Sequence, residues 1–239
     1  MIRALLALAL ATGGCGDDDD DSADAGPDDA GPWATGELTC AHQPLADYAD
    51  REYSFADGFD RQGLGRNWHS DASDAWAIED ERHLVATGEG APPGALAMVA
   101  DGQPGSEIVA WVDVAREAGW DGAPAVLCRA DGPPVTTGHG VRVTAAEMEL
   151  VEVSADGAVS GHERADLASS LPDAGSARLV VGCTGTTLTA FVFALGEGAP
   201  ALLGCVSRTI SDDPASGAVA LTQTSGRTAF DDVRVELVR

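Results

Sequence analysis

Three glutamates stand close together in a segment whose residue types could do acid–base chemistry. The segment reads Glu147-Met148-Glu149-Leu150-Val151-Glu152. Hydrolysis of a glycosidic bond with retention of configuration uses two carboxyl groups about 5 Å apart, one as nucleophile and one as acid and base. Residues two positions apart on a strand are separated by about 6–7 Å, so neighbouring glutamates could form such a pair. The alternative, which we favour, is a hairpin strand whose glutamates face water.

Binding a saccharide requires fewer precisely placed groups than hydrolysis does. It needs an exposed aromatic ring to stack on sugar C–H groups, and polar side chains to orient hydroxyls. Trp120 lies in a polar, glycine-flanked loop and is the best stacking candidate. His139, between two glycines and close to Arg142, is the next candidate for contact with a ligand. Trp120 could instead cover the end of the domain, and His139 could simply fill a turn. Trp111 has apolar neighbours on both sides and is expected in the core.

The N-terminal segment predicts export and a tether. A single positive charge precedes the apolar run Ala4–Ala11, which is too short to cross a bilayer as a mature helix. The small residues before Cys15 resemble a bacterial lipobox, so we predict a signal peptide over 1–14 and lipidation of Cys15. Ordinary signal-peptide cleavage near this point is the alternative. Residues 15–51 are rich in Asp, Gly, Ala and Pro and predict a disordered acidic linker and lead-in segment.

Four further cysteines predict disulfides. An even number in an exported chain favours pairing, and four cysteines allow three connectivities. Cys128 and Cys183 lie in apolar strand-like segments, whereas Cys40 precedes the domain. We therefore prefer Cys128–Cys183 together with Cys40–Cys205, in the oxidising environment of a cell envelope.

The charge of the chain excludes some partners. The 239 residues include 39 acidic and 14 basic residues, every basic one an arginine, for a net charge of -25. A nucleic-acid binder needs clustered cations to displace phosphate counterions, and an anionic membrane surface repels such a chain, so we expect neither partner. Hydrophobic residues make up 44% of the chain, which is enough to form a core.

Short apolar segments between turn residues predict one all-β domain over residues 52–239. Val141–Thr144 alternates apolar and polar residues, as in an antiparallel strand with one buried face. Only Glu163–Ser170 could form a short helix, which Pro172 would end. The predicted strands are Glu52–Ala56, Trp76–Ile78, Leu84–Thr87, Ala95–Val99, Glu107–Ala115, Ala125–Arg129, Gly140–Thr144, Glu149–Ser154, Arg178–Cys183, Thr187–Ala194, Leu202–Arg208, Ala218–Gln223 and Ala229–Val238.

Three stretches resemble a known family. Residues 59–68 read FDRQGLGRNW and are followed by WAIEDERHL at 76–84, and FDDVRV stands near the end of the chain at 230–235. They are similar to the opening and the last strand of concanavalin A-like (laminin G-type) jelly-roll domains. The resemblance implies two antiparallel sheets in a jelly-roll β-sandwich, with Trp68 packed at its edge. It also implies saccharide binding, which many of these domains perform outside cells.

The same resemblance suggests roles for the glutamates. Laminarinase-like glycoside hydrolases on this fold carry an E-x-D-x-x-E strand, in which a bulge brings three carboxylates to one face. Carried over to this chain, Glu147 would be the nucleophile and Glu152 the acid and base. Glu149 stands between them where the family has Asp, which lengthens the helper side chain.

Four aspartates could form a structural calcium site of the kind found in related carbohydrate-binding modules. Asp57 and Asp60 belong to the first strand region, and Asp231 and Asp232 to the last, and the two strands pair in jelly rolls. The alternative is that Asp231 and Asp232 mark a bulge, with one side chain capping a turn. We expect no other cofactor, because the sequence contains no phosphate loop, dinucleotide fingerprint or CxxC zinc pair.

We therefore expect a monomeric, lipid-anchored protein of the bacterial cell envelope that binds a glycan or envelope polysaccharide without catalysis. A glycoside hydrolase that uses the glutamates is one alternative. A structural or protein-interaction lipoprotein without a small ligand is another. Exposed aromatic rings on a concave sheet face would favour binding, clustered carboxylates in a cleft would favour the enzyme, and a face packed with Ala and Val would favour the third.

Overall fold

Every element that the structure describes is a strand, and alternating side chains place each strand between a packed interior and an outer face. This computed structural model describes residues 39–41, 54–70, 75–80, 83–86, 96–100, 105–116, 122–132, 134–154, 158–171, 175–210, 216–223 and 227–237. Within them the strands form two antiparallel sheets, of eight and seven strands.

The eight-stranded sheet runs in the order β13-β12-β11-β6-β15-β4-β3, with β1 beside β15. Its strands are β13 (Ala201–Thr209), β12 (Thr187–Leu195), β11 (Gly175–Thr184), β6 (Ile108–Arg116), β15 (Thr228–Leu237), β4 (His83–Ala86), β3 (Trp76–Glu79) and β1 (Phe55–Asp57). The register Phe55↔Val235 joins the first strand to the last, as expected from the sequence.

The seven-stranded sheet runs in the order β10-β9-β8-β7-β14-β5-β2. Its strands are β10 (Val159–Asp166), β9 (Glu147–Val153), β8 (Gly138–Val143), β7 (Pro124–Ala130), β14 (Ala218–Gln223), β5 (Leu96–Ala100) and β2 (Trp68–His69). Neighbouring strands of one sheet are far apart in the chain, such as β7 and β14, because the chain crosses repeatedly between the layers.

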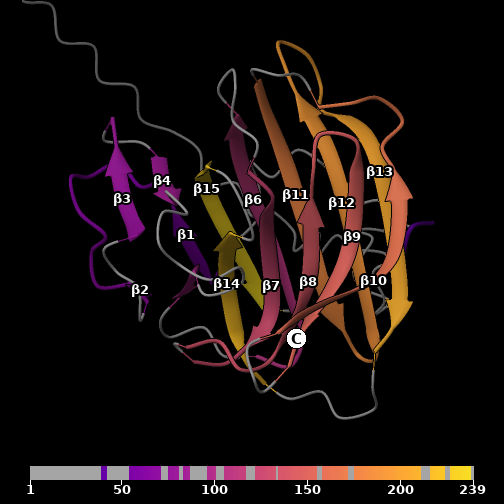
Figure 1. The fold of residues 1–239 in the computed structure, drawn as a ribbon, viewed down its shortest axis with the longest axis horizontal. Helices are drawn as coiled ribbons and strands as arrows, with labels where there is room; N and C mark the ends of the chain where they lie inside the picture. Colours follow the sequence, from indigo (N-terminus) through magenta and orange to yellow (C-terminus); the bar gives the residue numbers. More distant parts are fainter. Residues whose placement is uncertain are drawn as a thin grey trace, which may run out of the picture. The chain divides into compact units, whose positions relative to one another are not determined.

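The interior between the two sheets is one large hydrophobic cluster. Val126 and Leu150 from the seven-stranded sheet pack with Val181 and Phe230 from the eight-stranded sheet. Figure 1 shows the two layers, with β8 and β9 in one and β11 and β12 in the other. The structure thus confirms the predicted all-β sandwich of two antiparallel sheets.

One segment differs from what the sequence allowed. The short helix that Glu163–Ser170 could have formed is absent, because residues up to Asp166 belong to strand β10, where Arg164 pairs with Glu149. The polar stretch from Ser160 to Arg164 hid this strand, since β10 is an edge strand exposed along most of its length and shows no apolar alternation. The backbone beyond it is held by hydrogen bonds such as Leu167 N to Ala146 O.

Among the described residues, no helix has the length and apolar character needed to cross a membrane. The compact unit that contains the sandwich spans Pro32–Arg239.

Candidate functional site

Strand β9 carries the three glutamates, but it does not bring them to one face. Its register with β8 is regular from Met148↔Val143 to Val153↔Gly138, without a bulge. Because side chains alternate along a regular strand, Glu147 and Glu149 face one side and Glu152 faces the other. The bulge in this region lies instead on the neighbouring strand β10, after Gly161. The arrangement expected from the E-x-D-x-x-E resemblance is therefore not formed.

Glu149 lies at the centre of an ion-paired row on the outer face of the seven-stranded sheet. It stands directly opposite Arg142 on β8 and Arg164 on β10. Arg142 Nη2 donates to Glu149 Oε2, and Arg164 Nε donates to Oε1 at 2.6 Å. We call these three residues the β8–β10 ladder.

The ladder keeps Glu149 ionised. Burial raises the pKa of the carboxyl, but hydrogen bonds from Arg142 and Arg164 and their positive charges outweigh it, so the pKa lies below its ordinary value of 4.5. A carboxylate with a lowered pKa, held by two cations, is a poor proton donor at neutral pH. The geometry therefore suits Glu149 to orienting the arginines and not to catalysis.

Gly161 provides the space in which Glu149 sits. A Cβ atom at Gly161 would lie 1.9 Å from Glu149 Oε1, so any larger residue would displace the carboxylate. Arg164 is bound through Nε, and its side chain is 62% exposed. The ladder thus presents oriented guanidinium N–H donors at the outer face, and such groups can bind the hydroxyl oxygens of a polar ligand.

His139 and Glu152 lie on the opposite side of the same sheet from the ladder. They pair directly across β8 and β9, and His162 Nε2 lies 3.1 Å from Glu152 Oε2. Burial lowers the pKa of His139 below its ordinary value, which Glu152 partly offsets. His139 and Arg142 therefore cannot contact one ligand as the sequence suggested. His162 pairs with Glu152, and Trp120 lies outside the described residues.

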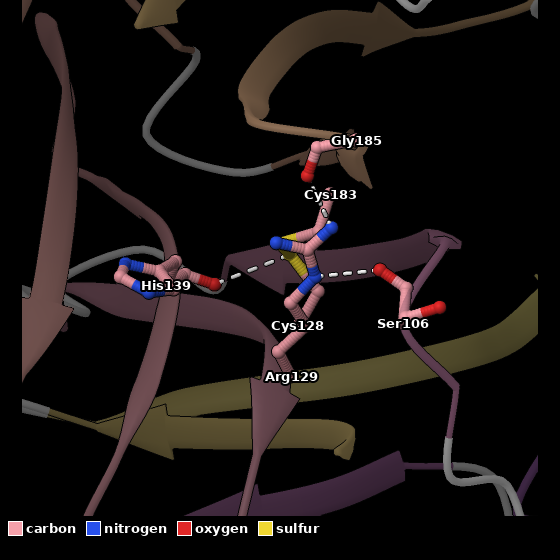
Figure 2. Close-up of a disulfide and its surroundings, with 6 residues drawn as sticks. All are labelled: Ser106, Cys128, Arg129, His139, Cys183 and Gly185. Atoms are coloured by element: carbon pink, nitrogen blue, oxygen red, sulfur yellow. Dashed lines mark hydrogen bonds between the residues drawn. A yellow bond between two sulfur atoms is a disulfide. The ribbon is translucent and has the colours of Figure 1, made fainter. Parts of the chain in front are cut away.

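Arg129 is a buried cation that was not expected from the sequence. It has a positive φ of 53° and follows Cys128 at a register shift between β7 and β14. Its Nε donates to Ser106 O and its Nη2 to Gly185 O, both at 2.6 Å. Figure 2 shows this guanidinium beside the disulfide of Cys128, between two backbone carbonyls. The signal available in the sequence was an arginine inside the apolar segment PAVLCRA.

Asp57 is a hydrogen-bond acceptor and not a free metal ligand. Its Oδ1 and Oδ2 accept from Arg61 Nη1 and Nη2 at 2.5 and 2.8 Å, while Phe59 N and Trp68 Nε1 donate at 2.9 and 2.8 Å. In the motif that carries the family resemblance, hydrogen bonds to the carboxylate of Asp57 therefore stabilise the local fold. Trp68 is buried as expected.

The other aspartates do not complete a calcium site with Asp57. Asp232 has a φ of 39° at a register shift of β15 and pairs with Arg234 at 2.7 Å, so the bulge interpretation is confirmed. Burial raises the pKa of Asp231, and the nearby charges of Asp232 and Asp60 raise it further. Across the described ranges, no group of three or more His, Cys, Asp or Glu side chains is placed to hold a metal ion.

Two disulfides join distant parts of the chain, with the pairing preferred from the sequence. Cys128–Cys183 links β7 to β11 and so connects the two sheets, with Cα atoms 6.1 Å apart. Cys40–Cys205 links the lead-in segment to β13, with a Cα separation of 5.7 Å. Such bonds indicate an oxidising, extracytoplasmic location. Cys15 lies outside the described residues.

Comparison with known proteins places the fold. No protein-family model matches the chain, and no curated protein matches its sequence. Among solved structures, the carbohydrate binding module CBM66 from Bacillus subtilis matches with a TM-score of 0.51 and 17% identity, over 67% of this chain and 90% of the module.

Two enzymes match the fold of this chain with similar TM-scores. The xylan beta-1,4-xylosidase from Bacillus halodurans C-125 matches with a TM-score of 0.55 and 14% identity, over 80% of this chain but only 40% of the enzyme. SCLam, a non-specific endo-beta-1,3(4)-glucanase from family GH16, matches with a TM-score of 0.52 and 13% identity, over 82% of this chain and 95% of the enzyme. Identities this low establish architecture alone. The chain has the jelly-roll-like, two-sheet β-sandwich fold of these structures.

Proposed function

We propose that this protein is an extracytoplasmic, non-catalytic β-sandwich that binds a saccharide and is tethered to the cell envelope through a lipidated Cys15. The observation that carries the proposal is the β8–β10 ladder, in which Glu149 holds Arg142 and Arg164 in fixed orientations on an outer sheet face. Preorganised donors of this kind bind hydroxyls without a further cost of ordering the side chains. The likeness of the fold to a carbohydrate binding module supports this ligand class.

The charge of the chain favours a neutral glycan. With a net charge of -25, the protein repels polyanions at long range. Within the ladder, Glu149 offsets one of the two arginine charges, so the ladder is no strong anion site. A neutral glycan or envelope polysaccharide, recognised through its hydroxyls, fits both facts.

The position of the glutamates argues against the glycoside hydrolase alternative. A retaining mechanism needs two carboxyl groups about 5 Å apart on either side of one bond. Glu147 and Glu152 face opposite sides of a regular strand, and the buried Glu149 between them is held by two arginines. The ladder therefore supports binding and not hydrolysis.

A glycan array with the full secreted chain tests the proposal, followed by calorimetry on any ligand found. Arg164→Ala removes an exposed guanidinium of the ladder, and losing one hydrogen bond to the ligand should weaken binding about tenfold. Arg66→Ala, at an exposed arginine of the β1–β2 connection, is the matched control and should leave affinity unchanged. Equal affinity in both variants would show that the ladder is not the site.

A protein-interaction role without a small ligand is the second candidate. One observation favours it: Trp68, Trp76 and Trp111, the tryptophans among the described residues, are at most 4% exposed and offer no stacking face. An array on which the chain binds no glycan would favour this role. Hydrolysis of any polysaccharide that Glu147→Gln abolishes would instead establish the enzyme.

A further inference from the structure

Arg129 is a buried arginine without a carboxylate partner among the described residues. Only 3% of the residue is exposed, and its guanidinium stays charged. Its hydrogen bonds run to two backbone carbonyls, Ser106 O and Gly185 O. A buried cation is costly unless an anion compensates its charge. The arginines that the structure shows in ion pairs with Asp or Glu are all more exposed than Arg129: Arg61, Arg142, Arg164, Arg178, Arg227 and Arg234.

The backbone turns the Arg129 side chain to the inner side of its sheet. Between the pairs Leu127↔Ala220 and Ala130↔Ala218, β7 has one residue more than β14, and such a bulge redirects a side chain. The positive φ of 53° is unfavourable for an arginine, and strain of this kind is common at functional sites. Figure 2 shows the guanidinium beside the disulfide that connects the sheets, with the nitrogen that makes neither hydrogen bond on the side of His139.

Further basic groups from both sheets lie near Arg129. His139 belongs to β8 and His162 to β10. Arg208 on β13 stands opposite Leu188, which packs in the interior, so Arg208 is on the inner side of its sheet. Burial lowers the pKa of His139, and nearby positive charges lower it further. These charges belong to Arg129, Arg208 and His162, so the four groups interact, and we call them the inner basic cluster.

Two carboxylates approach the inner basic cluster, but neither forms an ion pair with Arg129. Glu152 stands opposite His139, and its Oε2 lies 3.1 Å from His162 Nε2. Burial lowers the pKa of Arg129 and the charge of Glu107 partly offsets this, yet the described contacts include no ion pair between them. A guanidinium has five N–H donors, of which those of Arg129 Nη1 have no partner in the described parts of the chain.

We propose that the inner basic cluster binds a carboxylate group, with Arg129 as its principal contact and His139 as a second donor. A guanidinium binds a carboxylate through charge-assisted hydrogen bonds, and the ligand would supply the counter-charge that Arg129 lacks. The net charge of -25 repels polyanions, whereas distant charges act weakly on a single carboxylate beyond the screening length of about 8 Å. The carboxylate belongs to a small free acid or to a uronic acid in a glycan. The site lies on the opposite side of the seven-stranded sheet from the β8–β10 ladder and does not depend on it.

Thermal unfolding of the full chain, with its disulfides intact, tests the proposal in sodium acetate and in sodium chloride of equal ionic strength. With a dissociation constant of about 1 mM, acetate at about 100 mM should raise the Tm by about 8 °C above the value in chloride. Arg129→Met should abolish this difference. Arg234→Met removes an arginine that already has a carboxylate partner and should keep it, as should Arg164→Ala in the ladder.

Sodium glucuronate in place of acetate distinguishes the two sources of the carboxylate. An equal rise in Tm would show that the carboxylate alone is recognised, and a larger rise would assign the site to a uronic acid. Both results support a carboxylate site.

A second variant keeps the test independent of whether Arg129→Met folds. His139→Ala alters a less buried side chain and should weaken acetate binding about tenfold, because one hydrogen bond to a charged group is lost. The proposal is overturned if the unmodified chain has the same Tm in acetate and in chloride. It is also overturned if the rise in acetate persists undiminished in Arg129→Met or in His139→Ala.

Discussion

Replacing Asp57 by Ala tests whether the hydrogen bonds to this carboxylate, in the motif that carries the family resemblance, stabilise the fold. The carboxylate accepts four hydrogen bonds, two from Arg61 and one each from Phe59 N and Trp68 Nε1. The substitution removes all four and leaves the donors behind. The Trp68 indole is buried, so its N–H cannot regain a water partner without opening the packing.

The expected loss follows from these contacts. Breaking a buried ion pair costs about 3–5 kcal/mol, but the Arg61 side chain is 30% exposed and can rehydrate, so we take about 2 kcal/mol for it. The two neutral donors add about 1 kcal/mol each. We therefore expect Asp57→Ala to lower the free energy of unfolding by about 4 kcal/mol. For a domain of this size that corresponds to a fall in Tm of about 12 °C.

Urea and thermal unfolding with the disulfides intact measure this effect. Asp60→Ala, an exposed neighbour in the same loop, is the control and should change stability by less than about 0.5 kcal/mol. A loss at Asp57 no larger than that of the control would refute the reasoning. So would a Tm that calcium raises in the unmodified protein but not in Asp57→Ala, since the carboxylate would then be a metal ligand.

Three further predictions concern the ladder and the link between the sheets. Gly161→Ala should cost about 1–3 kcal/mol in urea unfolding because its Cβ meets Glu149, whereas Gly196→Ala, which meets nothing within 4 Å, should cost much less. Because the pKa of Glu149 is lowered in the folded protein, its carboxylate stabilises the fold above pH 4.5, and this stabilisation is lost as the pH falls through the folded-state pKa. The urea midpoints at pH 6 and pH 3 should therefore differ more in the unmodified protein than in Glu149→Gln. Replacing both Cys128 and Cys183 by Ala opens a loop of 55 residues and should lower the free energy of unfolding by about 4 kcal/mol, and a loss below 1 kcal/mol would contradict the loop-entropy estimate.

The sequence predicted the fold where side chains alternate between a buried and an exposed face. Val141 and Val143 of β8 and Val233 and Val235 of β15 follow this pattern and lie in the interior. No such alternation marks β10, an edge strand with polar residues on both faces. In an all-apolar strand, the residue types do not distinguish one side from the other. Trp111 is buried as expected, yet it packs with Phe191 and Phe193 in a cluster separate from the interior between the sheets.

The site was less predictable because it depends on register. Residue types named Arg142 and Glu149 as candidates, but for separate roles, and only the pairing of β8 with β9 sets them opposite each other. Arg164 was not predicted as a site residue, since its segment shows no apolar alternation and could equally have formed a short helix. The position of the bulge determines which side of the sheet each glutamate faces. The bulge lies after Gly161 on β10 and leaves β9 regular, and nothing in the β9 segment itself predicts that position.

The Cys40–Cys205 bond has a mechanical consequence. Strand β1 has three residues and, within the part of the chain that the structure describes, pairs with β15 alone, so a load on the chain just before Phe55 would peel it away one hydrogen bond at a time. Because of the disulfide, a force that arrives from the N-terminal end is transmitted at Cys205 to β13 and never reaches β1. The load thereby enters the sandwich in the middle of a nine-residue strand that pairs with β12 along its length, and the three-residue pairing of β1 with β15 lies outside the path of the force.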